Sequence, residues 1–125
     1  MEIDGDLRNA VNCEREKFGG KVYSNGSESI FIAILPGYLD YVDLDRCAEI
    51  VGTEVMPIAL IEDQFDSLLL ISKTGDIYLC FIDGEDLSIE PYAKSLREAI
   101  GKALNVNACL LWMYCKREKS ERSNG

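Results

Sequence analysis

Two uninterrupted apolar runs near the middle of the chain constrain its fold more than any other feature. They are Leu68 to Ile71 and Ile77 to Ile82, and the turn Lys73-Thr74-Gly75 separates them. A strand with one solvated face alternates apolar and polar residues, whereas a continuous run indicates a strand covered on both faces. We therefore expect two antiparallel strands, Ser67–Ser72 and Asp76–Ile82, at the centre of a sheet. The glycine between them supplies the positive φ angle that a three-residue hairpin requires.

Segments on either side of this hairpin supply further strands and the helices that would cover them. Apolar runs mark strands, and apolar residues at helical spacing mark helices. The expected strands are Lys21–Ser24 and Ser29–Leu35, joined at Asn25-Gly26, and Pro57–Ile61, and the expected helices are Asp6–Phe18, Leu44–Val51 and one that begins at Ser95. Because the strands come in hairpins, the fold class is α+β, with a central antiparallel sheet of about five or six strands and helices packed around it.

Residues that start and stop helices frame these segments. The expected N-caps and stops are Asp6 with Gly19-Gly20 and Asp43 with Gly52. Ser95-Leu96-Arg97-Glu98 is a capping box, and the stripe of residues that its helix would bury is Leu96, Ala99, Ile100, Ala103 and Leu104. Asn107 is the expected cap of a last helix from Ala108 to about Lys116.

The length of the chain allows a single domain. With 125 residues, of which 47% are hydrophobic and 28% charged, it has the composition of one globular unit. We expect this domain to span residues 1–117 and the charged, serine-rich residues 118–125 to form a disordered tail. The acidic N-terminus does not have the composition of a signal peptide. The longest apolar stretch, Ala108 to Cys115, is far shorter than a membrane span.

Negative charge is concentrated in the middle of the chain. The 22 carboxylates outnumber the 13 Lys and Arg residues, and residues 40–90 contain thirteen of those carboxylates but only Arg46 and Lys73 as cations. Such a chain repels phosphates and anionic lipid, so neither nucleic-acid binding nor membrane docking is expected. A surface of one sign attracts basic partners and speeds their encounter, although the same charge also serves solubility.

The sequence lacks the residues needed for most catalytic and metal sites. It has no histidine, which excludes Ser-His and Cys-His nucleophilic systems and removes the commonest transition-metal ligand. The cysteines are Cys13, Cys47, Cys80, Cys109 and Cys115. Their odd number and wide spacing are typical of free thiols in a reducing cytoplasm and not of a zinc site. The acidic clusters lack the ligand order of a calcium loop, so we expect no metal, cofactor or catalytic residue.

Carboxylates in two predicted loops are the candidate partner-binding residues. One loop follows the strand Pro57–Ile61 and contains a phenylalanine, which would serve as an apolar anchor ringed by charge. The other loop follows Asp76–Ile82. The candidates are Glu62, Asp63, Phe65 and Asp66, then Asp83, Glu85 and Asp86, and, as a second choice, the tyrosine-containing segment with Tyr38, Asp40 and Tyr41. For Tyr92 and Trp112, partner contact and core packing both remain open.

Five short motifs, taken in their order along the chain, resemble those of one protein superfamily. They are a helix ending in Phe18-Gly19-Gly20, the segment Val51 to Ala59, the run Ser67 to Ile71, the hairpin Lys73 to Tyr78 and the helix start Ser95 to Ile100. This layout, from Glu16 to Leu104, resembles the SUKH superfamily of bacterial immunity proteins and is most similar to its third subgroup. Two features depart from the pattern. Ala59 replaces a common glycine, and the segment before Phe-Gly-Gly is shorter than in members with a long leading helix.

The resemblance implies a function. Members are encoded beside polymorphic toxins and protect the producing cell by binding the toxin domain, often a nuclease or deaminase. Nucleases have basic clefts, which an acidic surface can occupy in place of the substrate. We therefore expect a cytoplasmic, non-catalytic immunity protein, a monomer or weak homodimer, that neutralises a cognate toxin in a stoichiometric complex. Two alternatives stay open: a cytoplasmic scaffold or regulatory adaptor of the same fold, and a small hydrolase that uses carboxylates alone.

Overall fold

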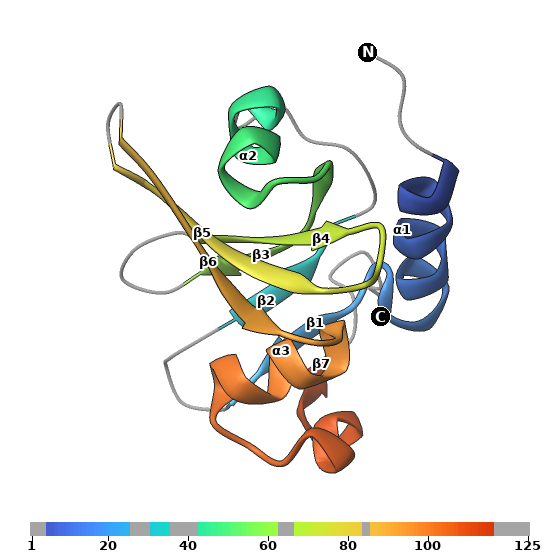
Figure 1. Ribbon diagram of the computed structural model, residues 1–125. Coiled ribbons are helices and arrows are strands. Elements are labelled where there is room, and N and C mark those ends of the chain that lie inside the picture. The colour runs from blue at the N-terminus through green and yellow to red at the C-terminus, as the bar shows by residue number, and fades with distance from the viewer. Residues whose placement is uncertain (1–4, 26–30, 36–42, 63–66, 84–85, 117–125) are drawn as a thin grey trace.

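The structure, a computed structural model, describes residues 5–25, 31–35, 43–62, 67–83 and 86–116 (Figure 1). Its helices are α1 (Gly5–Phe18), α2 (Leu44–Val51), α3 (Leu96–Leu104) and the 3-10 helix η1 (Ala108–Tyr114). Its strands are β1 (Val22–Ser24), β2 (Phe31–Ile34), β3 (Val55–Glu62), β4 (Ser67–Ser72), β5 (Ile77–Asp83), β6 (Asp86–Ala93) and β7 (Cys115–Lys116). Among these residues, no helix has the length and apolar content needed to cross a membrane.

The strands form one antiparallel sheet in the order β6-β5-β4-β3-β2-β1-β7. The two strands with continuous apolar runs, β4 and β5, are neighbours, and β4 pairs with β3 on its other side. At one edge lies β6, and at the other lies β7, a two-residue strand that pairs with β1. This sheet, with helices packed against it, confirms the expected α+β class.

The turn between β4 and β5 has the predicted three-residue form. Gly75 adopts a φ angle of 92°, which side chains rarely tolerate. The backbone N–H of Ser72 donates to the carbonyl of Asp76 over 3.0 Å. The Thr74 hydroxyl bridges the two strands, because it lies 3.0 Å from the Ser72 hydroxyl and donates to the Asp76 carboxylate over 3.0 Å. Backbone geometry and side-chain hydrogen bonds together fix the register of the central hairpin.

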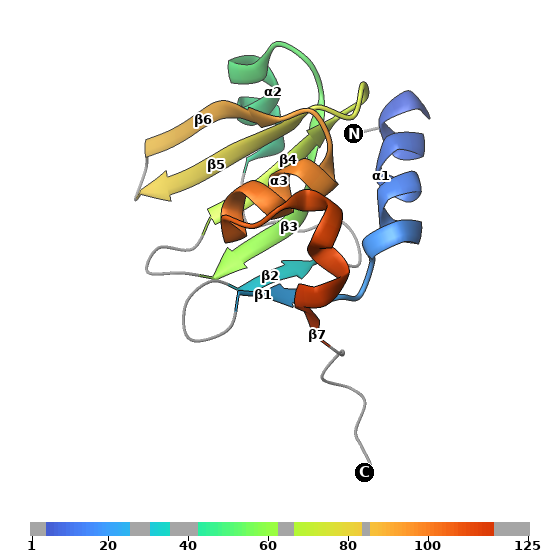
Figure 2. The ribbon, with the colours of Figure 1, turned by 90° about the horizontal axis from the view of Figure 1, so that it is seen from below.

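The side chains of β4 enter two separate cores. Leu69 and Ile71 belong to the larger core, on the face that α1, α3 and η1 cover, whereas Leu68 and Leu70 belong to a smaller core beneath α2. Figures 1 and 2 show α2 and α3 on opposite sides of the sheet. Every residue of β4 is buried, so the expected double covering is confirmed for this strand. The expectation that both faces are covered is wrong for the end of β5, where Phe81 and Ile82 are partly exposed.

The ends of α2 form as predicted, but the start of α1 does not. The Asp43 carboxylate accepts hydrogen bonds from the backbone N–H groups of Asp45 and Arg46, at 3.1 and 3.3 Å. Gly52 ends the helix, and its N–H donates to the carbonyl of Ala48 over 2.8 Å. In contrast, Asp6 lies inside the first turn of α1, because that helix begins at Gly5. Its charge there still faces the positive end of the helix dipole.

The capping box of α3 forms with a shift of one residue. The Ser95 hydroxyl accepts from the N–H of Glu98 over 3.1 Å, as expected. The Glu98 carboxylate accepts from the N–H of Lys94 over 2.8 Å, one residue before the N-cap that a capping box predicts. The predicted buried stripe is confirmed for Leu96, Ala99, Ile100 and Leu104, and Ala103 is partly buried.

The Phe18-Gly19-Gly20 sequence makes a tight exit from α1. The N–H of Gly19 donates to the carbonyl of Arg15 over 2.7 Å, and a side chain on Gly19 would collide with that same carbonyl. Phe18 turns into the larger core, where its ring packs edge-on against Tyr23 at 6.2 Å. The Arg97 guanidinium lies 5.7 Å from the Phe18 ring centre. This one aromatic side chain therefore links α1, β1 and α3.

Two segments differ from the sequence prediction. The sequence predicts a loop at Asp83 to Asp86 and no strand before Ser95, but Asp86 begins β6, whose Leu87 and Ile89 alternate with polar residues and whose Pro91 is tolerated at a sheet edge. The expected helix from Ala108 to Lys116 is the 3-10 helix η1 followed by β7. Asn107 caps η1 as predicted, by accepting from the N–H of Cys109 over 2.8 Å. Only one η1 side chain is buried, so no long amphipathic helix is needed there.

Other predicted features lie wholly or partly outside the described residues. These are the Asn25-Gly26 turn, the first residues of the strand Ser29–Leu35 and the tail at 118–125. The strands on either side of the first turn do pair, from Val22 opposite Ala33 to Ser24 opposite Phe31.

We expect Leu69→Ala to lower the free energy of unfolding by about 2–5 kcal/mol, because it leaves a cavity in a strand with no solvated face. Urea denaturation monitored by circular dichroism measures the change. Ile50→Ala is the matched control, because this side chain is 45% exposed and its truncation should cost under about 1 kcal/mol. Equal losses in the two variants would contradict the central position of β4.

Stability should also fall at alkaline pH. Burial, followed by the neighbouring Cys115, raises the pKa of Tyr23 to about 12, and burial, followed by Cys47, raises the pKa of Cys80 to about 12. Both groups ionise at lower pH in the unfolded chain, so their stabilisation is complete below about pH 9 and is lost as the pH rises towards 12. Urea denaturation at several pH values measures this loss. Tyr23→Phe should flatten the part of the decline above pH 10, and an unchanged decline would contradict the assignment.

Candidate protein-binding surface

The antiparallel order of the strands brings carboxylates together at one end of the sheet. β3 and β5 both run antiparallel to β4, so they run in the same direction and end on the same side. β3 ends at Glu62, β5 ends at Asp83, and β6 starts at Asp86, which pairs with Asp83. Figures 1 and 2 show these strand ends on the side of the molecule opposite α1. We call the surface formed by Glu62, Asp86, Phe31 and Ile82 the acidic sheet end.

The structure describes part of the predicted partner-binding set. Glu62 and Asp86 are exposed, and Asp83 occupies the last position of β5. The predicted residues that lie outside the described part of the chain are Asp63, Phe65 and Asp66, Glu85, and Tyr38, Asp40 and Tyr41. The first four belong to the segments that join β3 to β4 and β5 to β6, so they are adjacent in sequence to the acidic sheet end. The last three follow β2, which runs away from Glu62.

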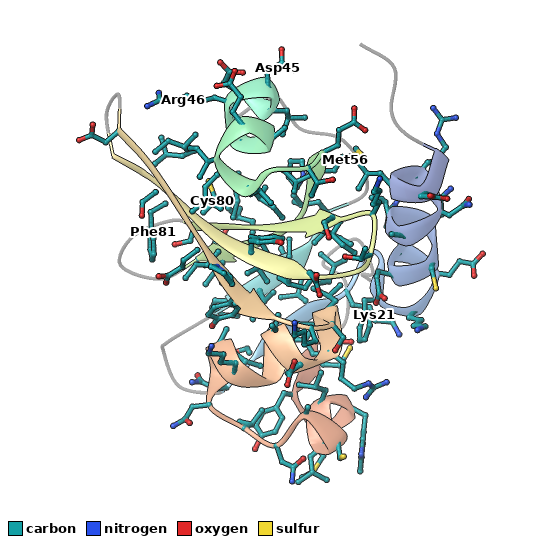
Figure 3. All side chains as sticks on the ribbon, viewed as in Figure 1. Lys21, Asp45, Arg46, Met56, Cys80 and Phe81 are labelled. Atoms are coloured by element: carbon teal, nitrogen blue, oxygen red, sulfur yellow. The ribbon has the colours of Figure 1, made fainter. Side chains whose placement is uncertain are left out.

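Apolar side chains are exposed beside these carboxylates. Phe31 is 41% exposed and pairs with Glu62, and Ile82 is 44% exposed and pairs with Leu87. The register places Phe31, Glu62 and Ile82 on the face that α2 covers elsewhere. Phe81 is 39% exposed on the opposite face, at the same end of the sheet (Figure 3). Apolar side chains bordered by charge are typical of protein-binding surfaces.

The length of α2 explains why this end of the sheet is bare. Eight residues of α-helix span roughly 12 Å, whereas the eight residues of β3 span roughly 26 Å. The smaller core beneath α2 contains Val55, at the start of β3, together with Leu70 and Cys80. On β4 and β5 this core continues as far as Leu68 and Cys80, one row of side chains short of Glu62 and Ile82, so α2 leaves the last residue of β3 uncovered. The exposure of Phe31 and Ile82 depends on how the elements pack together, which is why the sequence alone did not predict it.

Charge is also separated across the sheet. Residues 43–54, which contain α2, have four carboxylates and only Arg46 as a cation. Figure 3 shows Asp45 and Arg46 on the outer part of this helix. Residues 94–102, on the opposite face, have three cations and only Glu98 as an acid. The segment that contains α2 is therefore acidic, and the segment that contains α3, on the opposite face, is basic.

The charged groups that line the depression beside α3 have structural roles. The depression has a volume of about 500 Å³, and its lining includes Asp76, Glu98, Tyr92 and Lys102. Asp76 accepts from Thr74, Glu98 caps α3, and the Lys102 ammonium donates to the Tyr92 carbonyl over 3.0 Å while lying 4.5 Å above the Tyr92 ring. Burial, followed by Glu90, raises the pKa of Tyr92. Tyr92, left open by the sequence, therefore packs against its own chain.

Trp112 belongs to a second exposed apolar group. It is 73% exposed, and its neighbours Met113 and Leu110 are 56% and 41% exposed, whereas Leu111 is buried in the larger core. η1 packs against α3, so this group lies on the face of the sheet opposite α2. In the part of the chain that the structure describes, no group of three or more His, Cys, Asp or Glu side chains is arranged to hold a metal ion.

Comparisons with protein-family models, curated proteins and solved structures give no match to this chain. The interpretation of the acidic sheet end therefore depends on its own geometry and composition.

We expect Glu62→Gln combined with Asp86→Asn to change the free energy of unfolding by less than about 0.5 kcal/mol, because both side chains are exposed. Urea denaturation of the double variant tests this expectation. Asp43→Ala is the contrasting variant, since it removes the α2 cap and should cost about 1 kcal/mol. A large loss in the double variant would mean that these carboxylates stabilise the fold and are not free to serve a partner.

Proposed function

We propose that this protein is a non-catalytic immunity protein that binds a cognate basic toxin in a stoichiometric complex and so neutralises it. The observation that carries the proposal is the acidic sheet end, where Glu62 and Asp86 border the exposed side chains of Phe31 and Ile82. The resemblance of Glu16 to Leu104 to SUKH immunity proteins is a second, separate support. The toxin is a nuclease or another enzyme that modifies nucleic acids.

The two kinds of side chain have different roles in such a complex. The carboxylates attract a basic partner over about one Debye length, which raises the association rate and makes it depend on salt. The apolar side chains are removed from water on contact and slow dissociation, and a few such anchors account for most of the binding free energy of an interface. A nuclease cleft lined with Lys and Arg presents the matching charge, because it binds phosphates.

The state of the thiols fits a reducing compartment. All five cysteines are free, and Cys47 and Cys80 are buried without forming a disulfide. Structural disulfides are typical of secreted proteins and rare in the cytoplasm. The free thiols therefore support a cytoplasmic location, which is part of this proposal.

Co-expression with the product of the adjacent gene, followed by purification at low and at high salt, tests the proposal. We expect a one-to-one complex that weakens as the salt concentration rises. Absence of a complex at both salt concentrations would overturn the toxin-binding function and would favour the adaptor alternative.

Charge reversal at the acidic sheet end should weaken this complex. We expect Glu62→Lys with Asp86→Lys to lower the association rate at least about tenfold at low salt and by less at high salt. Glu16→Lys with Asp6→Lys is the matched control, because it makes the same change of charge on α1, on the other side of the molecule (Figure 1). Equal effects of the two double variants would show that net charge alone, and not this surface, governs binding. Stopped-flow measurement of association separates the two outcomes.

A further inference from the structure

The smaller core contains two cysteines from different elements in direct contact. Cys47 is the one buried side chain of α2, Cys80 lies in β5, and both are fully inaccessible to solvent. A hydrogen bond joins the two thiols. Cys80 also pairs with Leu68 on β4, and its strand has neighbours on both sides, so the contact lies over an interior strand of the sheet. Both cysteines carry free thiols in this state.

Burial keeps both thiols neutral, and their mutual contact shifts their pKa values in opposite directions. Burial is the main reason that the pKa of each is raised, and that of Cys80 reaches about 12. Their hydrogen bond raises the pKa of Cys80 and lowers that of Cys47. When α2 opens, Cys47 leaves the core with the helix while Cys80 stays in the sheet, so Cys47 is the thiol that meets solvent, ionises and reacts first.

α2 is held to the sheet by few buried contacts. The helix has eight residues, too few to be stable alone, and Cys47 is its one buried side chain. Elements with few buried apolar contacts open at a lower free energy than the whole domain does. Solvent and small oxidants therefore reach the pair through movement of α2, while β5 stays in the sheet.

We propose that Cys47 and Cys80 form a latent disulfide that fastens α2 to β5 when a peroxide oxidises the opened helix. The Cys47 thiolate attacks hydrogen peroxide, and protonation of the departing oxygen gives a sulfenic acid and one water molecule. The Cys80 sulfur then attacks the Cys47 sulfur, the S–S bond forms, and the hydroxyl leaves as a second water molecule after taking up the Cys80 proton. The two thiols lose two electrons, and the peroxide gains them. This proposal does not depend on the proposed function.

The first experiment asks whether the bond forms. In a Cys13→Ser, Cys109→Ser, Cys115→Ser background, which removes the exposed thiols, hydrogen peroxide should yield a monomer lighter by two hydrogen atoms and without free thiols after denaturation. Peptide mapping without reductant should identify the 47–80 link. The closed loop restricts the unfolded chain, so the thermal midpoint should rise by roughly 5–10 °C and return to its original value with reductant.

Two variants in the same background serve as controls. Cys80→Ala and Cys47→Ala should both abolish the loss of two hydrogen atoms, and the second preserves the packing of β5 if the first does not fold. Oxidation that instead gives only sulfinic acid, links between chains or no reaction would overturn the proposal.

The second experiment asks whether α2 controls the reaction. Asp43→Ala removes the α2 cap and should raise the oxidation rate about fivefold, because it favours the opened helix. Ser95→Ala removes the equivalent cap of α3, on the other face of the sheet, and should leave the rate unchanged. Equal rates in the two variants would overturn the role assigned to α2.

Discussion

The burial of β4 on both faces is the constraint on which the rest of the structure depends. A strand with no solvated side requires neighbouring strands at both edges and a covering layer on both faces. β3 and β5 are the neighbours of β4, α1 and α3 cover one face, and α2 covers the other. The two covers are unequal, because among the described residues the larger core has nineteen buried members and the smaller core has six. At about 25 cal/mol per Å² of buried apolar surface, the smaller core contributes less, which makes α2 the weaker layer.

This inequality links two features that lie far apart in the sequence. A short α2 leaves the end of β3 uncovered, so Phe31 and Ile82 meet solvent beside Glu62. The same shortness leaves Cys47 as the one fully buried anchor of the helix. The exposed surface and the easily opened layer therefore have one physical cause, the difference between the rise per residue of a helix and that of a strand.

Local signals in the sequence predicted most of the fold. The caps at Asp43 and Ser95 and the turn at Gly75 depend on neighbouring residues, and each forms as expected apart from the shifted partner of Glu98. β6 was missed, although Leu87 and Ile89 alternate with polar residues, because a proline argues against an interior strand and the sequence does not say which strand is at an edge. The antiparallel order of the strands predicts that β3 and β5 end on the same side of the sheet. The exposure of Phe31 and Ile82 beside these ends could not be predicted, because it depends on how much of the sheet α2 covers.

The edges of the sheet have a consequence for self-association. An exposed strand of eight residues is a template on which copies of a chain can stack into fibrils. In β6, Pro91 offers no N–H, and the register shift between Ile77 and Tyr78 interrupts the regular ladder beside it. At the opposite edge, β7 presents only two residues. Both edges are therefore poor templates for fibril growth, so the sheet does not readily add strands from other copies of the chain.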